Sequence, residues 1–95
     1  MMRIIENKSR VTGVVEYFEP PTVAGDHRVL KLRVTRVASV PGYPQLFKVG
    51  IGEQAAINIR KEEWDDAIMP GQTLSFDVKA GGPDLFFGED LNRES

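Results

Sequence analysis

The sequence predicts a single all-β domain, a small five-stranded barrel that spans residues 1–95. Three observations predict it. Several short segments alternate apolar and polar side chains with a period of two, which is typical of strands with one buried face. Clusters of glycine and proline separate these segments and mark turns. A chain of 95 residues with 41% hydrophobic content suits one core and leaves no room for a second domain.

The first predicted strand is Arg10 to Phe18. Val11, Val15 and Tyr17 share one face of this strand, because residues two apart point to the same side of a sheet. Gly13 lies between them. A glycine inside a strand is typical of a bulge or a sharp bend, which small barrels use to turn a corner.

The second predicted strand, Arg28 to Val37, has the clearest alternation. Its core face carries three aliphatic residues: Leu30, Leu32 and Val34. Lys31 and Arg33 therefore point outward. The proline-containing segment 40–44 follows as a loop from which Tyr43 is expected to project.

The third part of the sheet has two candidate segments, Leu46 to Ile51 and Ala55 to Arg60. They are interpreted either as two strands or as one bulged strand. Alternation places two groups of apolar side chains on the core face. They are Phe47, Val49 and Ile51 in the first segment, and Ile57 and Ile59 in the second. From Lys61 to Met69 the apolar spacing changes to i, i+3, i+4, which predicts one short helix.

Two strands complete the predicted domain. In Thr73 to Lys79 the core face is aliphatic and aromatic: Leu74, Phe76 and Val78. A glycine-rich turn then leads into Leu85 to Leu91. Phe86 and Phe87 are adjacent in this last strand, so one ring faces the core and the other faces outward. The pattern alone does not decide which.

The order of elements resembles the OB-fold, in which a helix lies between the third and fourth strands of a Greek-key barrel. The resemblance rests on the opening RVTGVVEYF, the helix-to-strand step MPGQTLSFDV and the last hairpin VKAGGPDLFFGEDL. It implies an all-β, five-stranded OB-like Greek-key barrel similar to small single-stranded DNA-binding proteins. It also implies a ligand face on strands two and three and on the loops that join strands one to two and four to five.

The residues argue against catalysis, so we expect a protein that is not an enzyme and has no catalytic residue, bound metal or cofactor. The chain has no cysteine, and its one histidine, His27, is interpreted as a solvent-exposed turn residue. The acidic pairs at 62–63 and 65–66 are adjacent on the predicted helix and diverge, so they are interpreted as a solvated face. The glycine pairs do not lead into a phosphate-binding helix.

Nucleic acid is the first predicted ligand. The formal net charge is -2, but residues 1–60 carry nine basic and five acidic side chains, whereas residues 61–95 carry three basic and nine acidic ones. Such a split can give the fold one basic side. Single strands are bound by cations that contact phosphates and by rings that stack on bases. The predicted binding residues are Lys31, Arg33, Arg36, Tyr43, Lys48, Arg60, Lys79 and Phe86.

A protein-protein interaction or assembly module is the alternative, with an exposed sheet edge or aromatic patch as the contact surface. The predicted partners are single-stranded DNA or RNA, with a protein partner as the alternative, and a homodimer is expected because a small core gains stability from association. Residues 1–10 lack the apolar run of a signal peptide, and no segment has the roughly 20 apolar residues of a membrane span. A cytoplasmic location without membrane contact is therefore expected.

Overall fold

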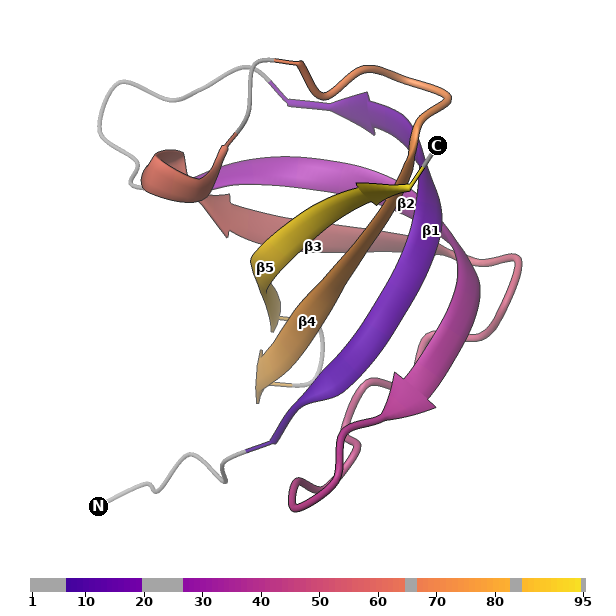
Figure 1. Cartoon of the computed structure of the whole chain (residues 1–95), viewed down its shortest axis with the longest axis vertical. Coiled ribbons are helices and arrows are strands. Elements are labelled where there is room, and N and C mark those ends of the chain that lie inside the picture. Colours follow the sequence, from indigo (N-terminus) through magenta and orange to yellow (C-terminus); the bar gives the residue numbers. More distant parts are fainter. Residues whose placement is uncertain (1–6, 20–26, 65–66, 83–84, 95) are drawn as a thin grey trace.

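The computed structural model describes residues 7–19, 27–64, 67–82 and 85–94. It is an all-β structure whose five strands close into a ring (Figure 1). The strands are β1 (Ser9–Phe18), β2 (His27–Ser39), β3 (Gln54–Arg60), β4 (Thr73–Gly82) and β5 (Leu85–Glu94), and a 3-10 turn, η1 (Lys61–Glu63), follows β3. The all-β class and the five-stranded sheet predicted from the sequence are confirmed.

The order of the strands around the ring is β1-β2-β3-β5-β4. β1 pairs antiparallel with both β2 and β4, and β2 with β3 and β4 with β5 are antiparallel as well. The ring closes through a short parallel pairing, in which Ile57, Asn58 and Ile59 of β3 face Phe86, Phe87 and Gly88 of β5. This seam brings together two parts of the chain that are far apart in the sequence.

The core lies inside the ring and has the composition that the alternation predicts. Eight predicted core residues are each 0% exposed: Leu30, Leu32, Val34, Ile57, Ile59, Leu74, Phe76 and Val78. Phe47 is also buried, as predicted. Burying one face of each strand fixes the register, since a shift of one residue would turn the apolar set toward water.

Gly13 lies at a bulge, as predicted, because the register between β1 and β2 shifts between Thr12 and Gly13. A second shift between Val15 and Tyr17 reverses the parity of the strand end. Val15 is buried, whereas Tyr17 is 50% exposed, so the prediction that the two share a face is wrong. Glu16 is the extra residue that turns Tyr17 outward.

The predicted helix from Lys61 to Met69 is wrong over the described residues. Only η1 is helical, and Trp64 already has an extended backbone with φ -71° and ψ 129°. The sequence also disfavours a long helix, because Asp65 and Asp66 are weak helix formers and Pro70 follows closely. The described part of the chain contains no helix that is long and apolar enough to cross a membrane.

The segment Leu46 to Ile51 is not a strand, so the two-strand interpretation of this region is wrong. A tight turn begins at Gly50, where Glu53 donates its backbone N–H to the Gly50 carbonyl at 3.1 Å and its carboxylate accepts the Gly50 N–H at 2.9 Å. The turn carries Ile51 away from the core, and this side chain is 71% exposed.

Candidate functional site

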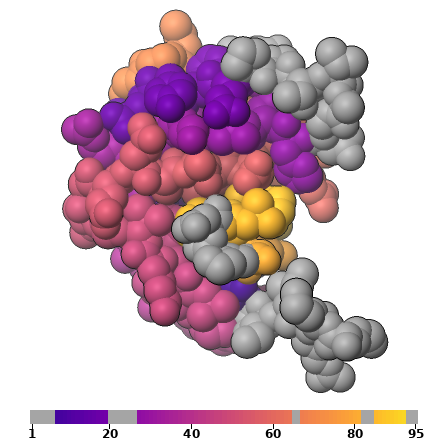
Figure 2. All heavy atoms as spheres, turned by 180° about the vertical axis from the view of Figure 1, so that it is seen from behind, coloured from indigo at the N-terminus to yellow at the C-terminus, as the bar shows by residue number. Residues whose placement is uncertain are grey.

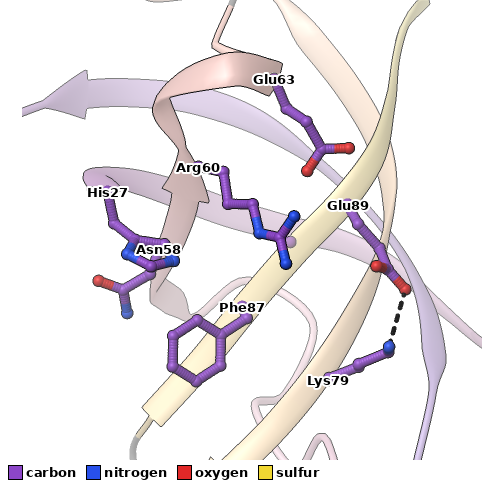
Figure 3. A pocket seen from close by; sticks show the side chains of 8 residues that line it. His27, Asn58, Arg60, Glu63, Lys79, Phe87 and Glu89 are labelled. Carbon is purple, nitrogen blue, oxygen red and sulfur yellow. Dashed lines mark ion pairs between the residues drawn. The ribbon is translucent and has the colours of Figure 1, made fainter.

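A cleft opens on the outside of the ring where the β3–β5 seam ends. Its volume is about 330 Å³, and it is lined by His27, Asn58, Arg60, Glu63, Lys79, Phe87, Gly88 and Glu89. These residues come from the first position of β2, the end of β3, η1, β4 and β5 (Figure 3). Seen from behind, β3 lies beside the yellow atoms of β5 (Figure 2). The parallel seam therefore builds the site.

Phe87 supplies the aromatic surface of the cleft. Its ring centroid is 5.6 Å from that of His27, and the two rings meet edge to face. Phe86, a predicted stacking ring, is only 7% exposed and packs against Phe47 with a centroid distance of 4.9 Å. That assignment is wrong, because alternation along β5 turns Phe86 inward and Phe87 outward.

Two predicted cations, Arg60 and Lys79, meet in the cleft. Lys79 pairs with Glu89 at 3.4 Å, and Lys8 approaches the same carboxylate oxygen at 3.7 Å. The exposed Arg60 side chain has no ion pair among the described residues. Arg60 is therefore the cleft cation that is available to an anionic ligand.

Hydrogen-bond acceptors line the remaining wall of the cleft. Asn58 donates its side-chain N–H to the Phe86 carbonyl at 3.0 Å, which fixes the orientation of its amide. Glu63 accepts the backbone N–H of Asp90 through Oε1 at 3.3 Å. Asn58 Oδ1 and Glu63 Oε2 accept no hydrogen bond from the described residues. The cleft thus combines a ring, an unpaired cation and unused acceptors.

Lys31 and Arg33 point outward on β2, as the alternation predicts, but only one of them is free. Arg33 pairs with Glu16 at 3.0 Å, and Gln54 donates to the other oxygen of the same carboxylate at 3.1 Å. Lys31 has no ion pair among the described residues and lies opposite Ala56 of β3. The outer face of β2 and β3 therefore carries Lys31 as an available cation beyond the cleft.

Three predicted binding residues, Arg36, Tyr43 and Lys48, are exposed but do not line the cleft. Arg36 is nine positions along β2 from His27, which corresponds to roughly 30 Å at the rise of an extended strand. Tyr43 is 39% exposed, and Lys8 Nζ lies 4.9 Å from its ring centroid. None of the three lines the cleft with Arg60 and Lys79, but Lys8, which lies against the Tyr43 ring, also approaches Glu89 of the cleft at 3.7 Å.

Six lining residues are not among the predicted binding residues: His27, Asn58, Glu63, Phe87, Gly88 and Glu89. In the structure, Gly88 shows which of the two phenylalanines faces the core. A Cβ on Gly88 would lie 2.7 Å from Ile59 Cδ1 and 2.9 Å from Ile57 Cγ2, so Gly88 faces the core. Phe86 shares its parity, which leaves Phe87 on the outer face. His27 is in a strand and beside a ring, so its interpretation as a turn residue is wrong.

No group of three or more potential metal ligands occurs among the described residues. Comparison with known proteins gives no matching family model, no matching curated protein and no matching solved structure. The functional argument therefore rests on the fold and on the side chains of the cleft.

Proposed function

We propose that this domain is an OB-type Greek-key barrel that binds single-stranded nucleic acid without catalysis. The spatial order of the strands supports the fold assignment. β1, β2 and β3 are consecutive antiparallel neighbours, and β4 returns to lie beside β1, which is the strand arrangement of a Greek key. The chain departs from the OB pattern in having a 3-10 turn where the family has a helix.

The observation that carries the proposed function is the shared position of Phe87 and Arg60 in one cleft. A ring offers a base a stacking surface, and this contact is sequence-tolerant because every base has a π-face. A guanidinium without a carboxylate partner can bind a backbone phosphate without first breaking an ion pair. The two side chains together match the two parts of a nucleotide.

The outer face of β2 and β3 extends this site. Lys31 and the cleft residue Asn58 both point outward, on neighbouring strands that are paired from His27–Arg60 to Arg33–Gln54. A single strand that leaves the cleft along this face meets Lys31 as its next free cation. Because Glu16 neutralises Arg33, we expect few phosphate contacts and an affinity that depends mainly on stacking.

Fluorescence anisotropy with a labelled single strand of about twelve nucleotides tests this proposal. Titrations at about 50 mM and about 200 mM salt separate the phosphate contribution from stacking. With Arg60 and Lys31 as the main contacts, the slope of log K against log salt should be about -1.4 for a single strand. DNA and RNA of the same sequence are compared in parallel. Absence of binding to either at the lower salt concentration would reject the proposal.

A second candidate function, contact with a protein partner, is favoured by the loop between β2 and β3. This loop exposes three large apolar side chains: Tyr43 at 39%, Leu46 at 36% and Ile51 at 71%. Apolar side chains grouped on one loop are typical of a contact surface. A second copy of this chain is the simplest partner, and it agrees with the homodimer that the small core predicts.

A further inference from the structure

We infer that the cleft selects the base that it binds, and that it prefers cytosine, which carries an exocyclic amino group, over thymine or uracil. This inference rests on the proposed function and adds a ligand preference to it. Arg60 is assigned to the phosphate, and Asn58 and Glu63 each keep an unused acceptor oxygen, whereas a base is distinguished by the donors and acceptors along its edge.

Asn58 is the first of these acceptors. It lies opposite Phe87 in the parallel pairing of β3 and β5, and adjacent strands are about 4.8 Å apart. A base stacked on the Phe87 ring therefore has Asn58 within reach of its edge. The amide N–H donates to the Phe86 carbonyl at 3.0 Å, so Asn58 presents its oxygen to the ligand.

Glu63 is the second acceptor. The Asp90 N–H holds one of its carboxylate oxygens at 3.3 Å, which fixes the side chain over the cleft, and the other oxygen is unused by the described residues (Figure 3). Asp90 has a positive φ of 55°, and the register between β4 and β5 shifts in the same stretch of β5. This irregular backbone aims the N–H at Glu63.

These acceptors distinguish two bases of similar size. Cytosine presents the donor N4–H₂, which a carboxylate or an amide oxygen accepts. Thymine and uracil present the acceptor O4 at the same position, so an oxygen of Glu63 or Asn58 would face another oxygen there. Stacking on Phe87 does not separate the bases, since it is available to both. With Arg60 assigned to the phosphate, the discrimination depends on the acceptor oxygens of Asn58 and Glu63.

The experiment compares oligo-dC and oligo-dT of about twelve nucleotides at neutral pH and about 50 mM salt. The wild-type protein should bind oligo-dC about tenfold more tightly, the lower part of the range for a base-edge contact. In Glu63→Gln the side chain keeps its size and still accepts the Asp90 N–H, but it gains a donor that thymine O4 can accept. The ratio of the two affinities should therefore fall toward one.

Glu53→Gln is the matched control. Glu53 also accepts a backbone N–H, that of Gly50 at 2.9 Å, and its substitution removes the same charge, but it lies in the β2–β3 loop and does not line the cleft. This variant should keep the tenfold ratio. Both variants should unfold at a similar urea concentration to the wild type, which excludes a loss of structure as the cause.

The outcomes separate the inference from the function on which it rests. Equal affinity of the wild type for oligo-dC and oligo-dT overturns the base preference and leaves single-strand binding intact. A preference that persists in Glu63→Gln overturns the assignment to this cleft. If neither oligonucleotide binds, both the proposed function and the inference fail. A preference that only Glu63→Gln removes supports both.

Discussion

Phe86 and Phe87 are adjacent in β5 and lie on opposite faces of the closed five-stranded sheet. Phe86 packs in the core with its ring centroid 4.9 Å from that of Phe47, whereas Phe87 lies in the cleft with its centroid 5.6 Å from that of His27. The same residue type in neighbouring positions thus lies in the core in one case and in the cleft in the other. The pair offers a matched test of core and site.

Phe86→Ala should lower the free energy of unfolding by about 3 to 5 kcal/mol, because it leaves a cavity in the core. Phe87→Ala should cost about 1 kcal/mol of stability but weaken single-strand binding by roughly 1 to 3 kcal/mol through lost stacking. Urea unfolding followed by the fluorescence of Trp64, the one tryptophan of the chain, measures the first effect. Anisotropy measures the second. Similar losses of stability in the two variants would contradict the assigned faces.

The core could be predicted from the sequence because alternation is a local signal. Leu30, Leu32 and Val34 follow a period of two, and a strand with one buried face admits a single parity. Predictions of which face a side chain lies on are wrong where an extra residue or a tight turn interrupts this period. Glu16 reverses the face of Tyr17, and the turn at Gly50 removes Ile51 from the core.

The site was harder to predict because its residues meet through long-range pairing. The β3–β5 seam places Asn58 opposite Phe87, and neither residue carries a local signal of the other. Neutralisation of a cation is also a long-range effect. Arg33 points outward, as its parity predicts, but the carboxylate that pairs with it belongs to Glu16 on β1. Alternation predicts the side of the sheet on which a charge lies and gives no information on its partner.

Gly13→Ala should destabilise the domain by about 1 to 3 kcal/mol, the usual cost of inserting a methyl group into a packed site. A Cβ at this position would lie 2.5 Å from the Arg33 carbonyl oxygen and 2.6 Å from Leu32 Cγ, so the backbone of β2 would have to move.

Gly50→Ala is the control for that substitution. The atom nearest to its Cβ would be Glu53 Oε1 at 2.5 Å, the end of a flexible exposed side chain that can rotate away. Gly50→Ala should lower the free energy of unfolding by less, about 0.5 to 1.5 kcal/mol, because only the hydrogen bond from the Gly50 N–H to the Glu53 carboxylate is lost. Urea unfolding of both variants measures the difference. A larger loss for Gly50→Ala would show that the β1–β2 bulge tolerates a side chain.

Ile51→Ser should weaken self-association. Ile51 is 71% exposed at the tip of the β2–β3 loop, and we expect the wild-type protein to dimerise at tens of micromolar, an estimate from the mass-action stabilisation of small domains. Met69→Ser is the control, because Met69 is 60% exposed on a different loop. Sedimentation velocity measures the dimer fraction. A wild-type protein that stays monomeric over this range, or a dimer that Ile51→Ser leaves unchanged, would reject this loop as the interface.

Arg60→Gln should reduce the salt dependence of single-strand binding more than Arg33→Gln does. Each phosphate contact of a single strand contributes about 0.7 to the slope of log K against log salt, because its formation releases condensed counterions. Arg60 has no ion pair among the described residues and lines the cleft with Phe87, so its loss should reduce the slope by about 0.7.

Arg33 has the same side chain and the same outward direction, but Glu16 holds it at 3.0 Å. A phosphate would have to replace that carboxylate, and the exchange of one anion for another changes the net interaction little. Arg33→Gln should therefore change the slope by less than about 0.3, under half of one contact. Both substitutions remove one positive charge, so a change due to net charge alone would be equal in the two variants. Equal slopes for Arg60→Gln and Arg33→Gln would show that binding depends on the overall field of the protein, and the cleft would lose its assignment as the phosphate site.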